Sequence, residues 1–161
     1  MEFILKSNYG EYIEKAKVLY EKYQDRITIP SDLAWVEEDK RLEACVGSIP
    51  KSAALTDIGS KTAKQYAGII KSSKTVFVNG PMGIFEQAAT EHGTKEIWNA
   101  LGETEAYTVL GGGDSIAATQ KYNLTDKISY ICTGGGALIR FLAGEELPVV
   151  KALRQAAKTF G

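Results

Sequence analysis

The stretch "VLGGGDSIAA" (Val109–Ala118) decides the fold. It contains the end of an apolar strand, then three glycines, an aspartate and the start of a helix. Glycine loses more conformational entropy on folding than any other residue, so such a run indicates a place where bare backbone is needed. A second stretch, "YICTGGGALIRFLAG" (Tyr130–Gly144), repeats this order further along the chain. The sequence therefore predicts two similar strand-to-helix connections.

Apolar periodicity predicts the elements on either side of these two stretches. Apolar residues spaced by three and four predict helices at 9–26, 61–70, 94–101, 115–121, 137–143 and 148–158. Runs of β-branched and aromatic residues predict strands at 27–30, 75–80, 106–110 and 128–132, and a strand pair in 33–47 around a charged turn. Asp57 and Ser60 are the expected caps of the helix at 61–70. The alternation of strands and helices predicts an α/β fold with a parallel sheet covered on both faces.

The two glycine runs are candidate phosphate sites. Right-handed crossovers place all strand-to-helix loops of a parallel sheet at one edge, where ligands of such sheets bind. The first amides of the helices at Ser115 and Ala137 lack internal partners and carry partial positive charge, which suits an anion. Asp114 is suited to magnesium, which takes carboxylate and phosphate oxygens together. The alternative is that both runs are tight turns needed only for packing.

Composition excludes several classes of function. The chain has 161 residues, with 19 basic and 20 acidic side chains and a net charge of −1, so a broad basic face for nucleic acid is not expected. The sequence has no G-x-x-x-x-G-K-[ST] loop, no G-x-G-x-x-G and no H-R-D or D-F-G set. Cys45 and Cys132 are expected to be buried thiols without a metal or a disulfide, and His92 is expected at the surface or at a helix end. No membrane span or signal peptide is expected, which makes the cytoplasm the expected location.

A third motif, "VNGPMGIFE" (Val78–Glu86), ends another strand at the same expected edge. Ile84 and Phe85 are candidates for the apolar wall of a base pocket, and the Glu86 carboxylate is a candidate acceptor for ribose hydroxyls. Taken alone, the motif fits an ordinary turn with a solvated glutamate equally well.

Together, "VNGPMGIFE", "GGGDS" and "TGGGA" followed by "GEELP" resemble the C-terminal, nucleotide-binding domain of phosphoglycerate kinases, from about Tyr12 to Leu153. The resemblance implies a Rossmann-like, three-layer α/β/α sandwich with a mainly parallel sheet. It also implies binding of magnesium–ADP or magnesium–ATP, and transfer of a phosphoryl group between 1,3-bisphosphoglycerate and ADP in glycolysis and gluconeogenesis.

The resemblance implies roles for residues of all three motifs. Gly134, Gly135 and Gly136 would present amides to the phosphoryl group in flight, and Asp114 would hold the magnesium. Ser115 stands where threonine is commoner in the family and keeps the hydroxyl. The implied nucleotide-binding residues are Asn79, Gly80, Pro81, Gly83, Ile84, Glu86, Gly111, Gly112, Gly113 and Ser115.

The resemblance also implies what residues 1–161 lack. The family's Gly-Gly-Ala-Lys segment and the first βα units of this domain have no counterpart in the sequence. The N-terminal domain, which binds 3-phosphoglycerate and carries a catalytic arginine, is missing too and is the expected partner. We therefore expect the C-terminal part of a phosphoglycerate kinase, inactive alone. The alternatives are a stand-alone, non-catalytic nucleotide-binding module, and a fold whose glycine turns only pack.

Overall fold

The structure is a computed structural model that describes residues 10–160, and the chain divides into two compact units, Met1–Pro30 and Ser31–Gly161. The described part of the first unit contains helix α2 (Gly10–Tyr23), as the apolar periodicity predicts, and none of its residues is buried. The strand predicted at 27–30 is wrong, because that segment has no strand partner among the described residues and stays irregular.

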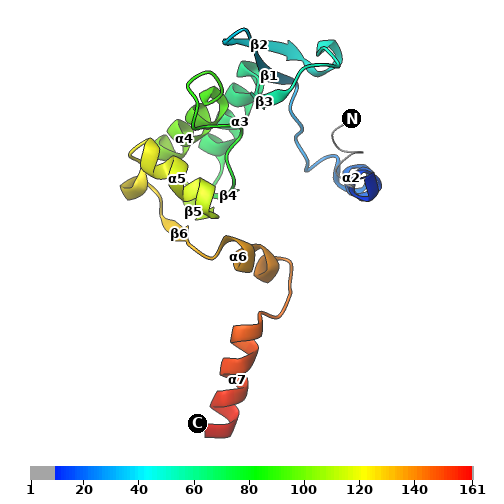
Figure 1. The fold of residues 1–161 in the computed structure, drawn as a ribbon. Coiled ribbons are helices and arrows are strands. Elements are labelled where there is room, and N and C mark those ends of the chain that lie inside the picture. Colours follow the sequence, from blue (N-terminus) through cyan, green and yellow to red (C-terminus); the bar gives the residue numbers. More distant parts are fainter. Residues whose placement is uncertain (1–9, 161) are drawn as a thin grey trace. The chain divides into compact units, whose positions relative to one another are not determined.

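The second unit begins with a three-stranded antiparallel sheet of order β2-β1-β3 (Figure 1). Strands β1 (Asp32–Glu37) and β2 (Lys40–Cys45) form the predicted strand pair. Both turn residues between them, Glu38 and Asp39, have positive φ, the geometry that matches the twist of a two-residue hairpin. Strand β3 (Leu55–Ile58) pairs with β1 and was not expected from the sequence.

Helix α3 (Ser60–Ser72) is capped by Asp32 of strand β1, not by Asp57 or Ser60 as predicted. The Asp32 carboxylate accepts hydrogen bonds from the backbone amides of Lys61, at 3.0 Å, and of Thr62, at 2.8 Å. Gly59 stands at the N-cap position without a side-chain cap of its own, and the Asp32 carboxylate fills the space that a Cβ atom on Gly59 would need. Burial alone would raise the pKa of Asp32, but hydrogen bonds from Thr62 and Lys61 outweigh it and lower that pKa below its ordinary value.

Replacing Asp32 by alanine is expected to destabilise the chain by about 2 kcal/mol, because two amides at the start of α3 lose a charged acceptor. Ser60→Ala, which removes an exposed hydroxyl that contacts Glu43 and His92, is the control and should cost less than about 0.5 kcal/mol. Urea unfolding measures both. Because the pKa of Asp32 is lowered in the folded state, its contribution to the free energy of unfolding is fully present above the unfolded pKa of about 3.9. This contribution is lost as the pH falls through the folded pKa. If the difference in free energy of unfolding between wild type and Asp32→Ala grew as the pH fell, this account would be wrong.

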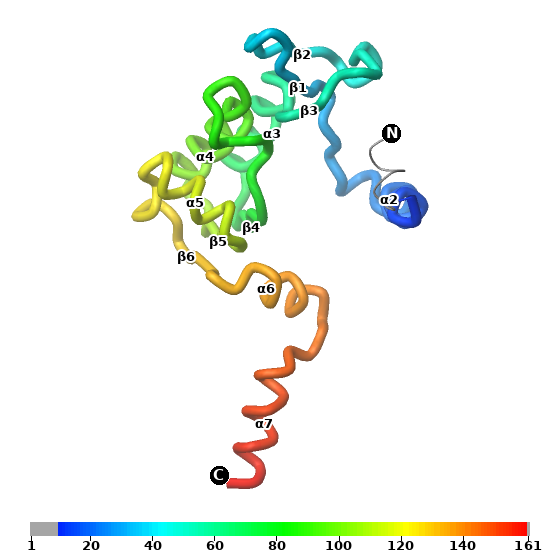
Figure 2. Tube along the Cα trace, in the orientation of Figure 1, coloured from blue at the N-terminus to red at the C-terminus, as the bar shows by residue number. Residues whose placement is uncertain are grey.

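The remainder of the second unit is built on a parallel sheet of order β4-β5-β6 (Figure 2). Its strands are β4 (Thr75–Asn79), β5 (Tyr107–Gly111) and β6 (Tyr130–Cys132). The helices between and after them are α4 (His92–Glu103), α5 (Gly113–Lys121), α6 (Gly135–Leu142) and α7 (Pro148–Phe160), with a 3-10 turn at Thr125–Lys127. A second 3-10 turn, Val46–Ser48, follows β2. The α/β fold with a parallel sheet and flanking helices is confirmed.

The two faces of the parallel sheet are covered unequally. On one face, Val78 and Leu110 pack into a core with residues of α3, α4 and α5, centred on the fully buried Trp98. On the other face, Leu138 of α6 lies against the carboxyl end of the sheet, next to the position of Gly111. Three aromatic side chains on this same face are exposed: Phe77, Tyr107 and Tyr130. They share a face because Phe77 and Tyr130 both pair with Val109, and Tyr107 lies two residues before Val109 in β5. No helix between residues 10 and 160 combines the length and the apolar character needed to cross a membrane.

Candidate functional site: the glycine-rich edge of the parallel sheet

The three parallel strands end at the same level. Asn79 of β4 pairs with Gly111 of β5, and Gly111 pairs with Cys132 of β6. The chain continues from β5 through Gly112 into α5, and from β6 through Thr133 and Gly134 into α6. The structure thus brings both glycine runs and the motif after β4 to one sheet edge, as predicted, while the ligand roles of these residues stay predictions.

The two glycine runs are in contact through their backbones. A Cβ atom on Gly135 would lie 2.5 Å from the Gly112 Cα and 2.7 Å from the Gly112 nitrogen. Gly112 has φ of 94°, a conformation that favours glycine. By contrast, added Cβ atoms on Gly113 and Gly136 would meet nothing within 4 Å. Backbone conformation therefore explains the glycine at position 112 and packing explains the one at 135, whereas those at 113 and 136 have no packing reason.

The amides that begin α5 and α6 receive no side-chain cap. Gly112 and Gly134 stand at the two N-cap positions, and neither makes a side-chain hydrogen bond. Ser115 is buried, and its hydroxyl oxygen accepts a 2.7 Å hydrogen bond from the Gly80 amide, which joins the β4 connection to α5. Two uncapped helix starts at one edge are suited to bind anionic groups.

Asp114 lies exposed in the first turn of α5, beside these glycines. Within residues 10–160, no three His, Cys, Asp or Glu side chains gather as a ready-made metal site. A single carboxylate with open space around it fits magnesium, which is commonly held by one or two carboxylates and completes its shell with phosphate oxygens and water.

The connection after β4 is held in place by hydrogen bonds from its own backbone. The amides of Met82 and Gly83 donate to the Thr94 hydroxyl at 3.1 and 3.2 Å, and the Ile84 amide donates to the Thr56 carbonyl at 3.0 Å. The side chain of Ile84 is 42% exposed, as a contact for a ligand requires. Phe85, expected beside Ile84 in the wall of a base pocket, instead lies in the core with 5% exposure.

The remaining predicted residues of this connection show mixed surroundings. Gly80 has a positive φ of 104°, and Pro81 is half-buried. A Cβ atom on Gly83 would lie 2.5 Å from Asp57 Oδ1, so packing alone accounts for that glycine. The Glu86 carboxylate is exposed, as an acceptor for a ligand hydroxyl must be.

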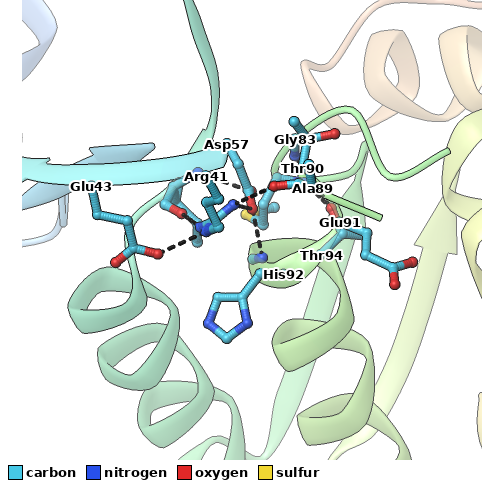
Figure 3. Close-up of polar contacts among 12 residues, drawn as sticks. Arg41, Glu43, Asp57, Gly83, Ala89, Thr90, Glu91, His92 and Thr94 are labelled. Carbon is cyan, nitrogen blue, oxygen red and sulfur yellow. Dashed lines mark hydrogen bonds and ion pairs between the residues drawn. The ribbon is translucent and has the colours of Figure 1, made fainter. Parts of the chain in front are cut away.

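Behind this connection lies a polar cluster that the sequence analysis missed, formed by Arg41, Glu43, Asp57 and the start of α4 (Figure 3). The Arg41 guanidinium contacts Glu43 and Asp57 at 2.8 Å each and also donates to the Ile58 carbonyl at 2.8 Å. The Asp57 side chain is fully buried and accepts hydrogen bonds from the amides of Gly93, at 2.7 Å, and Ile58, at 2.9 Å. The only local signal was the placement of Arg41 and Glu43 two residues apart on one face of β2.

Two charges on the other side of the connection complete its surroundings. Lys121 of α5 donates to the Phe85 carbonyl and lies 2.7 Å from the Glu91 carboxylate. The hydrogen bond from Lys121 lowers the pKa of Glu91, and burial together with the Glu91 charge raises the pKa of Tyr122.

In the antiparallel sheet, burial alone would raise the pKa of Glu43, but hydrogen bonds from Ser60 and Arg41 lower it below its ordinary value.

The predictions for cysteine and histidine have different outcomes. Cys45 is exposed, so its predicted burial is wrong: it is the last residue of β2, which pairs on one side only. Cys132 is half-buried, and both thiols are free. His92 begins α4, as expected for a helix end, with its Nε2 3.2 Å from the Ser60 hydroxyl.

The fold and this edge define an α/β protein whose parallel strands end together at a glycine-rich connection to two helices. A family model described as phosphoglycerate kinase matches residues 3–145. The chain belongs to the phosphoglycerate kinase family, which confirms the resemblance drawn from the three motifs.

Individual relatives agree with this assignment. The chain is 42% identical over 161 residues to a phosphoglycerate kinase of Thermoplasma volcanium and 40% identical over 157 residues to one of Methanothermus fervidus. It covers 39% and 38% of these proteins, so it spans about two fifths of their length. A crystal structure of phosphoglycerate kinase from Pyrococcus horikoshii is similar with a TM-score of 0.87 and 37% identity, over 99% of this chain and 40% of the other. A structure of phosphoglycerate kinase from Coxiella burnetii is similar with a TM-score of 0.82 and 34% identity, and the match covers 92% of this chain and 40% of the other.

Proposed function

We propose that residues 1–161 form the C-terminal, nucleotide-binding part of a phosphoglycerate kinase and bind magnesium–ADP or magnesium–ATP at the glycine-rich edge. The observation that carries this proposal is the meeting of two uncapped helix starts at the common end of three parallel strands. Glycines at positions 113 and 136 that packing does not require leave room for a ligand at the same place. Family membership supports a kinase as the parent activity.

The proposed roles follow the surroundings of each group. The backbone amides of residues 111–115 face the nucleotide phosphates, with Asn79 beside them, and Asp114 holds magnesium. Bound there, the ion supplies positive charge that offsets the charge of the phosphates. The exposed side chains of Ile84 and Glu86 contact the adenine and the ribose. The amides of Gly134, Gly135 and Gly136 stabilise the phosphoryl group in flight, which needs positioning and charge rather than covalent help.

In the parent enzyme, this part would work with an N-terminal domain that binds 3-phosphoglycerate, so that the phosphoryl group moves between 1,3-bisphosphoglycerate and ADP. A stand-alone, non-catalytic nucleotide-binding module is the second candidate, because the two uncapped helix starts and Asp114 would bind a nucleotide without a second domain. Titration of the purified chain with ADP, in the presence and absence of magnesium, tests both. Absence of binding in both conditions would leave only a packing role for the glycine turns.

The substitution Asp114→Ala is expected to weaken ADP binding about tenfold when magnesium is present and less than twofold when it is absent, since the carboxylate acts on the ion. Calorimetric titration of wild type and variant measures both affinities. Asp126→Ala, an acidic residue of the 3-10 turn at Thr125–Lys127, is the control and should bind like wild type. Equal losses with and without magnesium would make Asp114 a structural residue of the helix start instead.

A further inference from the structure

We infer that Arg41 and Asp57 are positioning residues for the nucleotide site: they set the place of the connection Gly80–Glu91 without contacting the ligand themselves. This inference rests on the proposed function of the glycine-rich edge. It assigns to the antiparallel sheet the task of holding this connection in place.

Asp57 contacts the chain near the start of the connection and directly after its end. Its Oδ2 accepts the Gly93 amide at 2.7 Å, which fixes the start of α4 directly after the connection. Thr94, one residue further, accepts the amides of Met82 and Gly83. At the other end, Gly83 packs so closely on Asp57 Oδ1 that no Cβ atom would fit between them. One buried carboxylate therefore determines where residues 82–84 and 93–94 lie.

Arg41 joins Asp57 to the connection. Its Nη1 donates to Asp57 at 2.8 Å and to the carbonyl of Ala89, in the connection, at 3.4 Å, while its Nη2 donates to the Ile58 carbonyl at 2.8 Å (Figure 3). A planar fork of donors matches three acceptors in a way that a lysine ammonium cannot. The Arg41 side chain is only 19% exposed, so water competes little for these contacts.

Strand β3 supports Ile84, the exposed residue that is proposed to face the ligand. The Ile84 amide donates to the Thr56 carbonyl, and Thr56 and Asp57 are neighbours in that strand. A shift of β3 relative to α4 would therefore move the Ile84 and Glu86 side chains away from their places. Misplacement of about 1 Å in a positioning element is enough to cost on the order of a hundredfold in an enzyme's rate.

The test uses Arg41→Lys, which keeps a positive charge beside the buried carboxylate and loses the fork. Glu43→Gln is the matched control, because Glu43 also contacts Arg41 but faces α3 and not the connection. Amide exchange is measured first, without nucleotide, at Ile84 and Gly93. ADP affinity in the presence of magnesium is measured second, and a thermal melt confirms that each variant is folded.

Arg41→Lys is expected to speed exchange at both amides about tenfold and to weaken ADP binding about tenfold. Glu43→Gln should lower the melting temperature with less than a twofold change in exchange at these amides and in affinity. When Glu86 is already replaced by alanine, the further loss of ADP affinity caused by Arg41→Lys should be smaller, because Arg41 places the connection that carries Glu86. When Asp114 is replaced by alanine, that loss should remain, because Asp114 lies on α5.

Unchanged exchange at Ile84 and Gly93 would overturn the inference, and so would faster exchange with an ADP affinity within twofold of wild type. If wild type itself bound no ADP, the proposed function would fail, and the exchange experiment would still decide whether Arg41 places the connection.

Discussion

The purified 161-residue chain is expected to form no ATP from ADP and 1,3-bisphosphoglycerate above the uncatalysed rate. Transfer requires an oxygen of the acceptor in line with, and roughly 3 Å from, the phosphorus of the transferred group, with cations that offset the developing charge. The proposed site offers Asp114 with its metal and two helix starts, and the sequence contains no Gly-Gly-Ala-Lys segment. Loss of one charge-stabilising donor typically costs on the order of a hundredfold in rate, and here several are lacking together.

A coupled assay for ATP measures this, with a full-length phosphoglycerate kinase as the positive control and ADP binding by the same sample as proof of a competent site. The binding control separates an inactive but intact nucleotide site from a misfolded one. Turnover close to that of the full-length enzyme, abolished by Asp114→Ala, would show that residues 1–161 are sufficient and that the proposed division of labour is wrong.

Gly135→Ala is expected to have the second largest effect, a loss of ADP affinity of at least about tenfold together with a destabilisation of about 1–3 kcal/mol. Its new methyl group would lie 2.5 Å from the Gly112 Cα and 2.7 Å from the Gly112 nitrogen, both backbone atoms that no side-chain rotation can relieve. The start of α6 must then move away from the start of α5, which separates the two sets of amides. Calorimetric titration with ADP and urea unfolding measure the two consequences.

Gly136→Ala is the matched control for the stability measurement alone, because Gly136 belongs to the proposed site. It is the next residue in the same helix, and its added methyl group would meet nothing within 4 Å. Alanine in a helix interior is more favourable than glycine by roughly 0.5–1 kcal/mol, so this variant should be at least as stable as wild type. If Gly135→Ala bound ADP like wild type, contact between the glycine runs would be irrelevant to binding.

The sequence predicted most elements of the second unit, because their signals are local. Strand β4 and helix α4 appear in the chain as a β-branched run and an apolar periodicity, and no distant residue is needed to recognise them. The glycine runs were equally recognisable, since an apolar strand precedes each one and a helix follows. The common level of the strand ends then follows from the parallel arrangement.

What the sequence did not predict depends on partners far along the chain. The cap of α3 is Asp32, which lies about thirty residues before the backbone amides that donate hydrogen bonds to it. Only the pairing of β1 with β3 brings Asp32 to the start of α3. The contacts of Asp57 with Arg41 and Gly93 are similar, because each joins elements that no periodicity relates. The segment 27–30 shows the reverse case: its composition suits a strand, yet a strand needs a neighbour to pair with.

The strand order β4-β5-β6 has a consequence for biosynthesis. Each strand of this sheet pairs with the strand that follows it in the chain, so no pairing has to wait for a segment translated much later. The entropic cost of closing such connections rises only slowly with their length, and nearby partners speed folding. We therefore expect the sheet to grow by one strand at a time as the nascent polypeptide leaves the ribosome, with β6 and the second glycine run added last.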